Sequence, residues 1–150
     1  MIITFCGHSN FQATPTLRQR LLKWLEQNAG EYAVFYLGGY GRFDTFALDC
    51  VREYKQEHKK VKIIFVTPYL SLSYQKNRLD YEKKRYDEIL YPNIECVPQK
   101  FAIIKRNRFM VENADWIVAF VNHDWGGAYS TYEYAKKKNK NIFNLANDGV

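Results

Sequence analysis

The sequence predicts an α/β fold, a Rossmann-like, open and mostly parallel sheet with helices on both faces. Short apolar runs alternate with amphipathic segments through all 150 residues, as in proteins built from repeated strand and helix units. The run at residues 61–69 is apolar along most of its length, which is typical of a strand covered on both faces. No linker, repeat or low-complexity stretch divides the sequence, so we expect one domain over residues 1–150.

Two strand and helix units open the chain. Residues 2–6 form a short apolar run that predicts the first strand. Residues 14–28 have helical spacing and begin with a threonine that can cap the helix and a proline at the first helical position. Residues 32–37 predict a second strand, and residues 45–58 predict a second helix after a glycine-rich turn.

The rest of the chain continues the alternation. We expect, in order, a strand at residues 61–69, a long helix at roughly 73–90, a short strand at 94–97, a helix at 101–114, a strand at 115–121, a helix at 124–138 and a final strand at 141–146.

Composition and charge restrict the classes of protein. The formal net charge of +6 is spread along the chain. It is interpreted either as solvated helix faces or as attraction to an anionic ligand. No long basic stripe is visible, so we do not expect a nucleic-acid partner. The first ten residues are too polar for a signal peptide, and no apolar run approaches membrane length, so we expect a cytoplasmic protein without a membrane partner.

The three cysteines are Cys6, Cys50 and Cys96. Their number is odd, and none are paired at metal-binding spacing. We therefore expect buried free thiols in a reducing compartment. No metal site and no cofactor are predicted.

Four loops should meet at one edge of the sheet. The carboxyl ends of parallel strands lie together, and ligands of open α/β sheets bind there. The loops are residues 7–10, 38–44, 67–72 and 122–129, and they are rich in Gly, Ser, Thr, His and Asn.

The first glycine-rich loop, LGGYGRFD, places Gly38, Gly39 and Gly41 between a strand and a helix. A helix start presents unpaired N–H groups and the positive end of the helix dipole, and glycines let a phosphate approach them. The spacing matches neither the G-x-G-x-x-G fingerprint nor a Walker loop. A tight turn without a ligand is the alternative.

The second glycine-rich loop, HDWGGAYSTYE, repeats this design. Gly126 and Gly127 open the backbone, Ser130 and Thr131 offer hydroxyls, and Glu133 could accept hydrogen bonds from a ribose. The alternative is a capping box, because Ser130 and Glu133 have the required S-x-x-E spacing.

Two further groups of residues could hold an anion. Arg106 and Arg108 precede a buried strand and are interpreted either as a phosphate or carboxylate clamp or as surface basicity. His8, Ser9 and Asn10 follow the first strand and could donate to a phosphate, although a solvated turn explains them equally well.

These motifs, GHSN, LGGYGRFDTFA, KRNRFMVENADWIVAF and GGAYSTYEYAKKKNKNIFNL, occur in an order that resembles the SLOG superfamily. That superfamily includes DNA-processing proteins and the "lonely guy" phosphoribohydrolases, whose motifs read roughly R-K-x-x-M and P-G-G-x-G-T-x-x-E. By resemblance, Arg106 matches the arginine and Glu133 the glutamate, with Met110 in step. The departures are Asn107 for lysine, Trp125 for proline, Tyr129 for the third glycine and Ser130 for threonine. We expect Tyr129 to narrow or reshape the phosphate loop.

The resemblance implies a nucleotide-binding domain, and three functions follow from it. The first is capture of a nucleotide or nucleotide-derived signal, of ADP-ribose or cyclic nucleotide type, by a sensor or sequestering protein. The second is hydrolysis of the N-glycosidic bond of nucleotides, with Glu133 and Arg106 as catalytic residues. The third is binding of single-stranded nucleic acid. The resemblance also implies a homo-oligomer. The candidate ligand-binding residues are Gly7, His8, Ser9, Asn10, Gly38, Gly39, Tyr40, Gly41, Asp44, Thr67, Pro68, Arg106, Asn107, Trp125, Gly126, Gly127, Ala128, Tyr129, Ser130 and Glu133.

Overall fold

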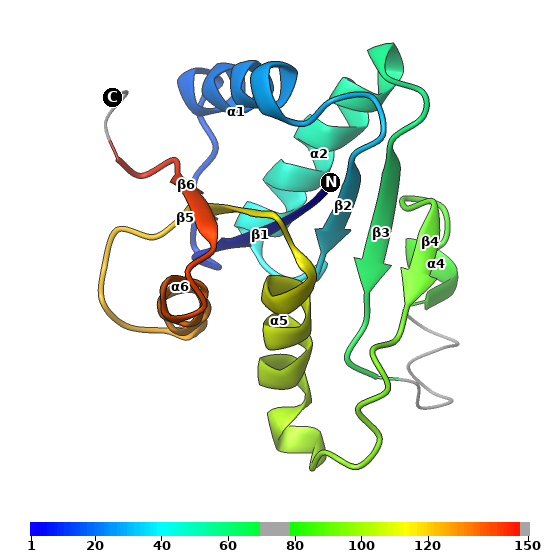
Figure 1. Ribbon diagram of the computed structural model, residues 1–150, viewed down its shortest axis with the longest axis vertical. Helices are drawn as coiled ribbons and strands as arrows, with labels where there is room; N and C mark the ends of the chain where they lie inside the picture. The colour runs from blue at the N-terminus through cyan, green and yellow to red at the C-terminus, as the bar shows by residue number, and fades with distance from the viewer. Residues whose placement is uncertain (70–78, 148–150) are drawn as a thin grey trace.

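Six parallel strands form a single sheet in a computed structural model, which describes residues 1–69 and 79–147 of the chain. The strand order is β4-β3-β2-β1-β5-β6 (Figure 1). This order confirms the predicted open, parallel α/β class, with β1 in the middle of the sheet. The strands are β1 (Ile2–Gly7), β2 (Val34–Leu37), β3 (Lys62–Val66), β4 (Glu88–Leu90), β5 (Trp116–Phe120) and β6 (Asn141–Asn144).

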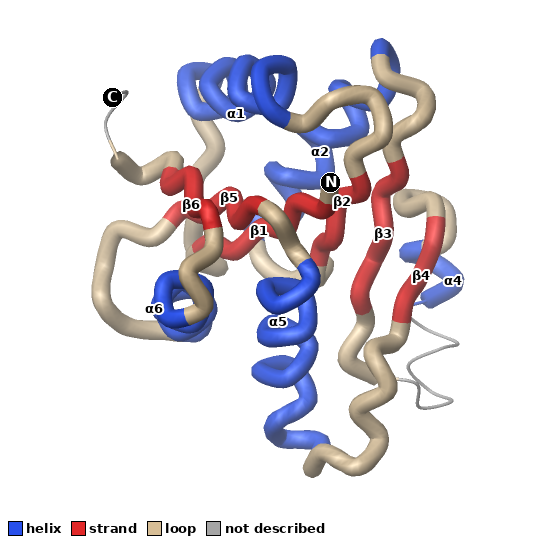
Figure 2. The backbone as a smooth tube through the Cα atoms, in the orientation of Figure 1, coloured by secondary structure: helices blue, strands red, loops and turns tan. Residues whose placement is uncertain are grey.

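Helices cover both faces of the sheet, as Figures 1 and 2 show. Side chains on a strand alternate between its two faces. On β1, Ile3 and Phe5 pack in the cluster that contains the α1 and α2 side chains, whereas Cys6 packs with α5 and α6. The two faces therefore have separate cores. The helices are α1 (Pro15–Asn28), α2 (Arg42–Glu57), α4 (Asp80–Glu82), α5 (Ala102–Asn113) and α6 (Gly127–Lys137), with a 3-10 turn, η2 (Gln99–Phe101).

Helix α1 has the predicted start. The Thr14 hydroxyl accepts the backbone N–H of Leu17 at 3.1 Å, and Pro15 occupies the first helical position. The helix ends before Gly30, whose φ of +80° lies in the left-handed region that glycine adopts without strain.

The long helix predicted at residues 73–90 is wrong at its carboxyl end. Residues 73–78 lie outside the described part of the chain, and residues 88–90 form strand β4 instead. Strand pairing outweighs the helical charge pattern, because β4 adds to the edge of β3 and the Asp87 carboxylate accepts the N–H of Ile63 at 2.8 Å.

The short strand predicted at residues 94–97 is also wrong. These residues form a turn between two prolines, and Asn93 precedes them with a φ of +57°. Cys96 is consequently exposed, whereas Cys6 and Cys50 are buried, and all three thiols are free. The expectation of buried thiols is therefore corrected for Cys96.

Helix α2 begins at Arg42, three residues before the predicted start. Its N-cap is Gly41, which has a φ of +92°, and Phe43 in the first turn packs beneath the end of β1. A Cβ on Gly7 would lie 2.2 Å from Cγ of Phe43, so this close approach requires a glycine. The earlier start moves Asp44 from the loop into the first turn of the helix.

No helix in the described ranges 1–69 and 79–147 combines the length and apolar character needed to cross a membrane.

Candidate functional site

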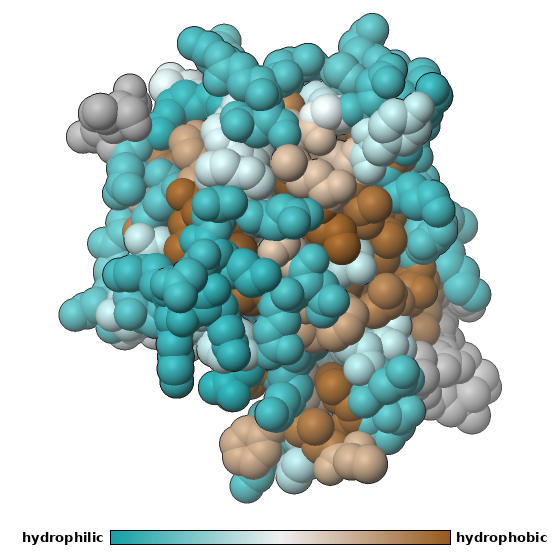
Figure 3. All heavy atoms as spheres, viewed as in Figure 1, coloured by the Kyte–Doolittle hydropathy of each residue, from teal (hydrophilic) through white to brown (hydrophobic). Residues whose placement is uncertain are grey.

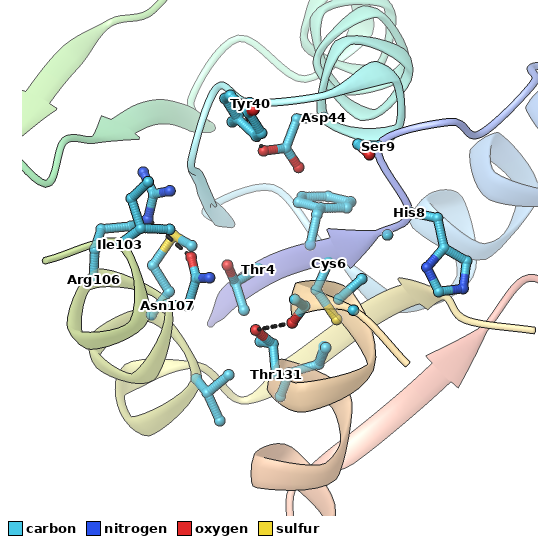
Figure 4. Close-up of a pocket in the computed structure, with 18 of the residues that line it drawn as sticks. Thr4, Cys6, His8, Ser9, Tyr40, Asp44, Ile103, Arg106, Asn107 and Thr131 are labelled. Carbon is cyan, nitrogen blue, oxygen red and sulfur yellow. Dashed lines mark hydrogen bonds between the residues drawn. The ribbon is translucent and has the colours of Figure 1, made fainter. Parts of the chain in front are cut away.

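A cavity of about 350 Å³ lies at the carboxyl edge of the sheet, and we call it the edge cavity (Figure 4). It is enclosed by the end of β1, the start of α2, one face of α5 and the loop that leads into α6. Tyr40 and Asp44 lie on one side of it and Thr131 on the opposite side (Figure 4). The predicted site residues that line it are Gly7, His8, Ser9, Asn10, Tyr40, Asp44, Arg106, Asn107, Trp125, Gly126, Gly127 and Ala128.

Eight predicted residues do not line the edge cavity. Gly41 faces a second cavity, and Thr67 is fully buried with its hydroxyl bonded to the carbonyl of Tyr69 at 3.1 Å. Residues 70–72 of the third loop lie outside the described part of the chain. The other residues that do not line it are Gly38, Gly39, Pro68, Tyr129, Ser130 and Glu133.

Several residues that line the edge cavity were not predicted from the sequence. Thr4 and Cys6 lie on the same face of β1, and the two-residue alternation of a strand would have grouped them. His123 was overlooked because a single histidine in a loop carries no pattern. Phe5, Ile103, Val111 and Ile117 also line the cavity without having been predicted, whereas Met110 and Thr131 belong to motifs that the sequence singled out.

Arg106 is buried and serves the fold. Its Nη1 donates to the carbonyl of Gly38 at 3.0 Å and to that of Val66 at 2.8 Å, and its Nε donates to Asn107 at 2.9 Å. It therefore ties α5 to the ends of β2 and β3. A Cβ on Gly38 would lie 2.9 Å from the guanidinium carbon, so the glycine makes room for an arginine.

The first glycine-rich loop is already occupied by a carboxylate. Asp44 accepts the N–H of Tyr40 at 3.0 Å and is also hydrogen bonded by the backbone of Gly39. Burial raises the pKa of Asp44 to about 6, although these N–H groups and Arg106 oppose the rise. The loop therefore presents a carboxylate to the edge cavity. It is thus no longer interpreted as a phosphate site.

The second glycine corner is open. Gly126 is the N-cap of α6 with a φ of +93°, and glycine has no side chain that could cap the first N–H groups. No atom lies within 4 Å of a Cβ placed on Gly126 or Gly127. The start of α6 therefore offers donors and the positive end of a helix dipole at the cavity wall.

The capping-box alternative is wrong. Ser130 lies inside α6, because the helix begins at Gly127, and its hydroxyl donates to the carbonyl of Gly126 at 3.2 Å. Glu133 pairs with Lys136 at 3.4 Å, and its side chain is 42% exposed. Tyr129 is partly buried against the core under α6 and its hydroxyl hydrogen bonds with Glu133. It does not line the edge cavity, and its effect on the loop stays a prediction.

Aromatic rings form the rim of the edge cavity. The rings of His8 and His123 stack with centroids 3.5 Å apart, and His123 stacks on Trp125 at 3.9 Å. His8 Nε2 accepts the N–H of Asn122 at 3.2 Å, so this imidazole is neutral, and burial lowers its pKa. Trp125 is 64% exposed, and Tyr40, on the other glycine-rich loop, is 71% exposed.

An apolar patch adjoins the edge cavity at the start of α5 (Figure 3). Phe101, Ile103 and Ile104 are exposed there, and Ile103 also lines the cavity. Exposed apolar patches are common at protein interfaces. The homo-oligomer implied by the sequence resemblance stays a prediction.

Solved structures share this fold. DNA processing protein A from Helicobacter pylori, known for a single-stranded DNA binding mode, aligns with TM-score 0.63 and 19% identity over 95% of this chain and 64% of its own. DNA processing protein A from Streptococcus pneumoniae aligns with TM-score 0.61 and 17% identity over 95% of this chain and 49% of its own. The molybdenum cofactor carrier protein from Chlamydomonas reinhardtii gives 0.56 and 14% over 94% and 73%.

The likeness to these proteins establishes the fold. The chain spans 64% and 49% of the two DNA processing proteins. No protein-family model matches the sequence, and no curated protein matches it. The resemblance to the SLOG superfamily stays a prediction, and a function has to be argued from the edge cavity itself.

Replacement of Arg106 tests its structural role. We expect Arg106→Leu to lower the free energy of unfolding by about 2–4 kcal/mol, because two buried carbonyls lose their donor. Urea denaturation followed by circular dichroism measures this. The control is Arg108→Leu on the exposed face of the same helix, for which we expect a change within about 0.5 kcal/mol. Equal effects of the two substitutions would contradict the role.

Asp44 should make stability depend on pH. Its pKa is raised from 3.8 to about 6 in the folded state. The protonated carboxyl therefore favours folding, and this contribution is lost as the pH rises through that window. Relative to the wild type, Asp44→Asn should gain stability between pH 4.5 and pH 7.5, measured by urea denaturation at both values. Asp49→Asn, which removes an exposed carboxylate from the same helix, is the control. A pH-independent difference would refute the assignment.

Proposed function

We propose that the protein binds a nucleotide or nucleotide-derived molecule in the edge cavity and leaves it unchanged. One observation carries the proposal: the uncapped start of α6 and the carboxylate of Asp44 line the same cavity, below two exposed aromatic residues. A nucleotide has the three matching parts, which are a phosphate, a sugar with hydroxyls and a planar base.

The phosphate belongs at the start of α6. Backbone N–H groups and the helix dipole attract an anion there. Gly126 and Gly127 leave the approach clear, since no atom lies within 4 Å of a Cβ on either. The first glycine-rich loop is unsuitable, because the ionised carboxylate of Asp44 would repel a phosphate.

The sugar and the base fit the remaining surfaces. Asp44 can accept hydrogen bonds from ribose hydroxyls, which are donors that a carboxylate prefers. Trp125 and Tyr40 present exposed rings, and aromatic side chains stack well on planar bases. The volume of about 350 Å³ lies near the lower end of small-molecule sites, so it suits one nucleoside phosphate.

This geometry favours a sensor or sequestering protein over a hydrolase. Cleavage of the N-glycosidic bond needs a carboxylate at the sugar carbon. Glu133 does not line the edge cavity and pairs with Lys136, and Arg106 donates to the backbone. Single-stranded nucleic acid is the second candidate ligand, since one structural neighbour is known for binding single-stranded DNA.

Gly127→Asp tests the phosphate position. Gly127 does not have a positive φ, and its surroundings leave room for a side chain. A carboxylate there interacts favourably with the helix dipole, so the variant should keep its stability. The same carboxylate repels a phosphate, so the affinity for AMP should weaken about tenfold or more. Isothermal titration calorimetry measures the affinity. Gly127→Asn is the uncharged control of the same shape, and equal losses in both variants would refute the electrostatic role.

Hydrolysis has its own test. The protein is incubated with nucleoside monophosphates, and free base is sought by chromatography. We expect none from the wild type, and we expect Glu133→Ala to keep its affinity for AMP within about twofold, because surface substitutions away from a site have small effects. Base release that disappears in Glu133→Ala would overturn the binding proposal and favour the hydrolase.

A further inference from the structure

A second cavity, of about 880 Å³, lies beside the edge cavity, between the start of α1 and the start of α2. We call it the α1/α2 cavity. Its walls come from the loop that follows β1, from the first turn of α1 and from the first two turns of α2. Ser9 lines both cavities, so the two spaces share one wall.

The shared wall consists mainly of backbone. The N–H of Arg42 donates to the carbonyl of Ser9 at 3.2 Å. A Cβ on Gly41 would lie 3.1 Å from Cα of Ser9, and the φ of Gly41 is +92°, so a glycine is required there. Gly41 adds no side chain to the wall, and Ser9 adds only a hydroxymethyl group. At Ser9 and Gly41 the two cavities are therefore separated only by backbone and one hydroxymethyl group.

The α1/α2 cavity combines an aromatic floor with a cation. Phe11 and Phe46 pack against each other with centroids 4.9 Å apart and form the floor. The hydroxyls of Thr14 and Thr45 are both engaged in hydrogen bonds with backbone groups. They are therefore not the groups that would hold an anion.

The two arginines that line the α1/α2 cavity differ in whether their side chains are already paired. Arg18 pairs with Glu53 at 3.3 Å. Arg42 is exposed, and within residues 1–69 and 79–147 its side chain makes no hydrogen bond or ion pair. Arg42 follows Gly41 directly in the sequence, so its side chain branches from the backbone beside the shared wall. Asp49, two turns further along α2, also lines the cavity.

We infer that the α1/α2 cavity is a second subsite of the same ligand site, and that the ligand class is two nucleoside units joined through phosphate. One unit occupies the edge cavity and the other lies over Phe11 and Phe46. The guanidinium of Arg42 binds the linking phosphate, since arginine pairs with phosphate oxygens through two parallel hydrogen bonds. This inference rests on the proposed function, because the first unit has to bind in the edge cavity.

The test compares two probes by isothermal titration calorimetry. AMP fills one subsite, and the linear ribodinucleotide pApA can fill both. We expect pApA to bind about tenfold more tightly than AMP or better, because a charge-assisted hydrogen bond contributes at least this factor.

Two variants remove the second subsite by different means. Arg42→Ala removes the cation, and Ala13→Trp, at an exposed position of the α1/α2 cavity, fills the space. Each should abolish the advantage of pApA and leave the affinity for AMP within about twofold of the wild type. Arg52→Ala removes an exposed arginine of α2 that lines neither cavity, and it should keep the advantage.

The outcomes separate the two proposals. Equal binding of AMP and pApA by the wild type overturns the second subsite and leaves the proposed function standing. An advantage that survives in both Arg42→Ala and Ala13→Trp also overturns the subsite. Failure of both probes to bind the wild type overturns the proposed function and the inference together.

Discussion

The buried guanidinium of Arg106 is the constraint on which the site depends. It joins α5 to the carbonyls of Gly38 and Val66, which are the ends of β2 and β3. A charge without its hydrogen bonds is costly in the interior, so the strand ends and the helix hold one another in place. The glycine-rich loop after β2 therefore starts from a fixed point, and the first turn of α2 brings Asp44 to the cavity.

The two glycine-rich loops present groups of opposite polarity to the edge cavity. At the start of α2, the Asp44 carboxylate takes the N–H groups of the loop, so that corner presents acceptors to the edge cavity. At the start of α6, Gly126 and Gly127 leave the donors uncovered. Under the proposed function, the hydroxyls of the ligand face α2 and its negative charge faces α6. Two phosphate-binding loops, which the glycines alone suggest, would not fix the orientation of a ligand.

Sequence periodicity predicted the sheet, its covering helices and the capped start of α1, because each depends on local spacing. It failed for β4, whose three residues are held by pairing with β3, a long-range interaction that local charges do not report. It also could not see that Arg106 would bond to Gly38, 68 residues away, or that His8 and His123 would stack. The loops that meet at the cavity were predictable from topology, whereas the partner of each side chain was not.

The departures from the phosphoribohydrolase motif gain a physical meaning in this arrangement. Trp125 stands where the motif has proline, and its ring extends a stack that runs through His123 to the buried His8. Under the proposed function, a ring that His123 already holds in place loses little entropy when a base stacks on it. Glu133 lies on α6 outside the edge cavity, where it pairs with Lys136. Under the proposed function, the loop before α6 supplies the stacking surface, while the carboxylate that matches the motif stays outside the edge cavity.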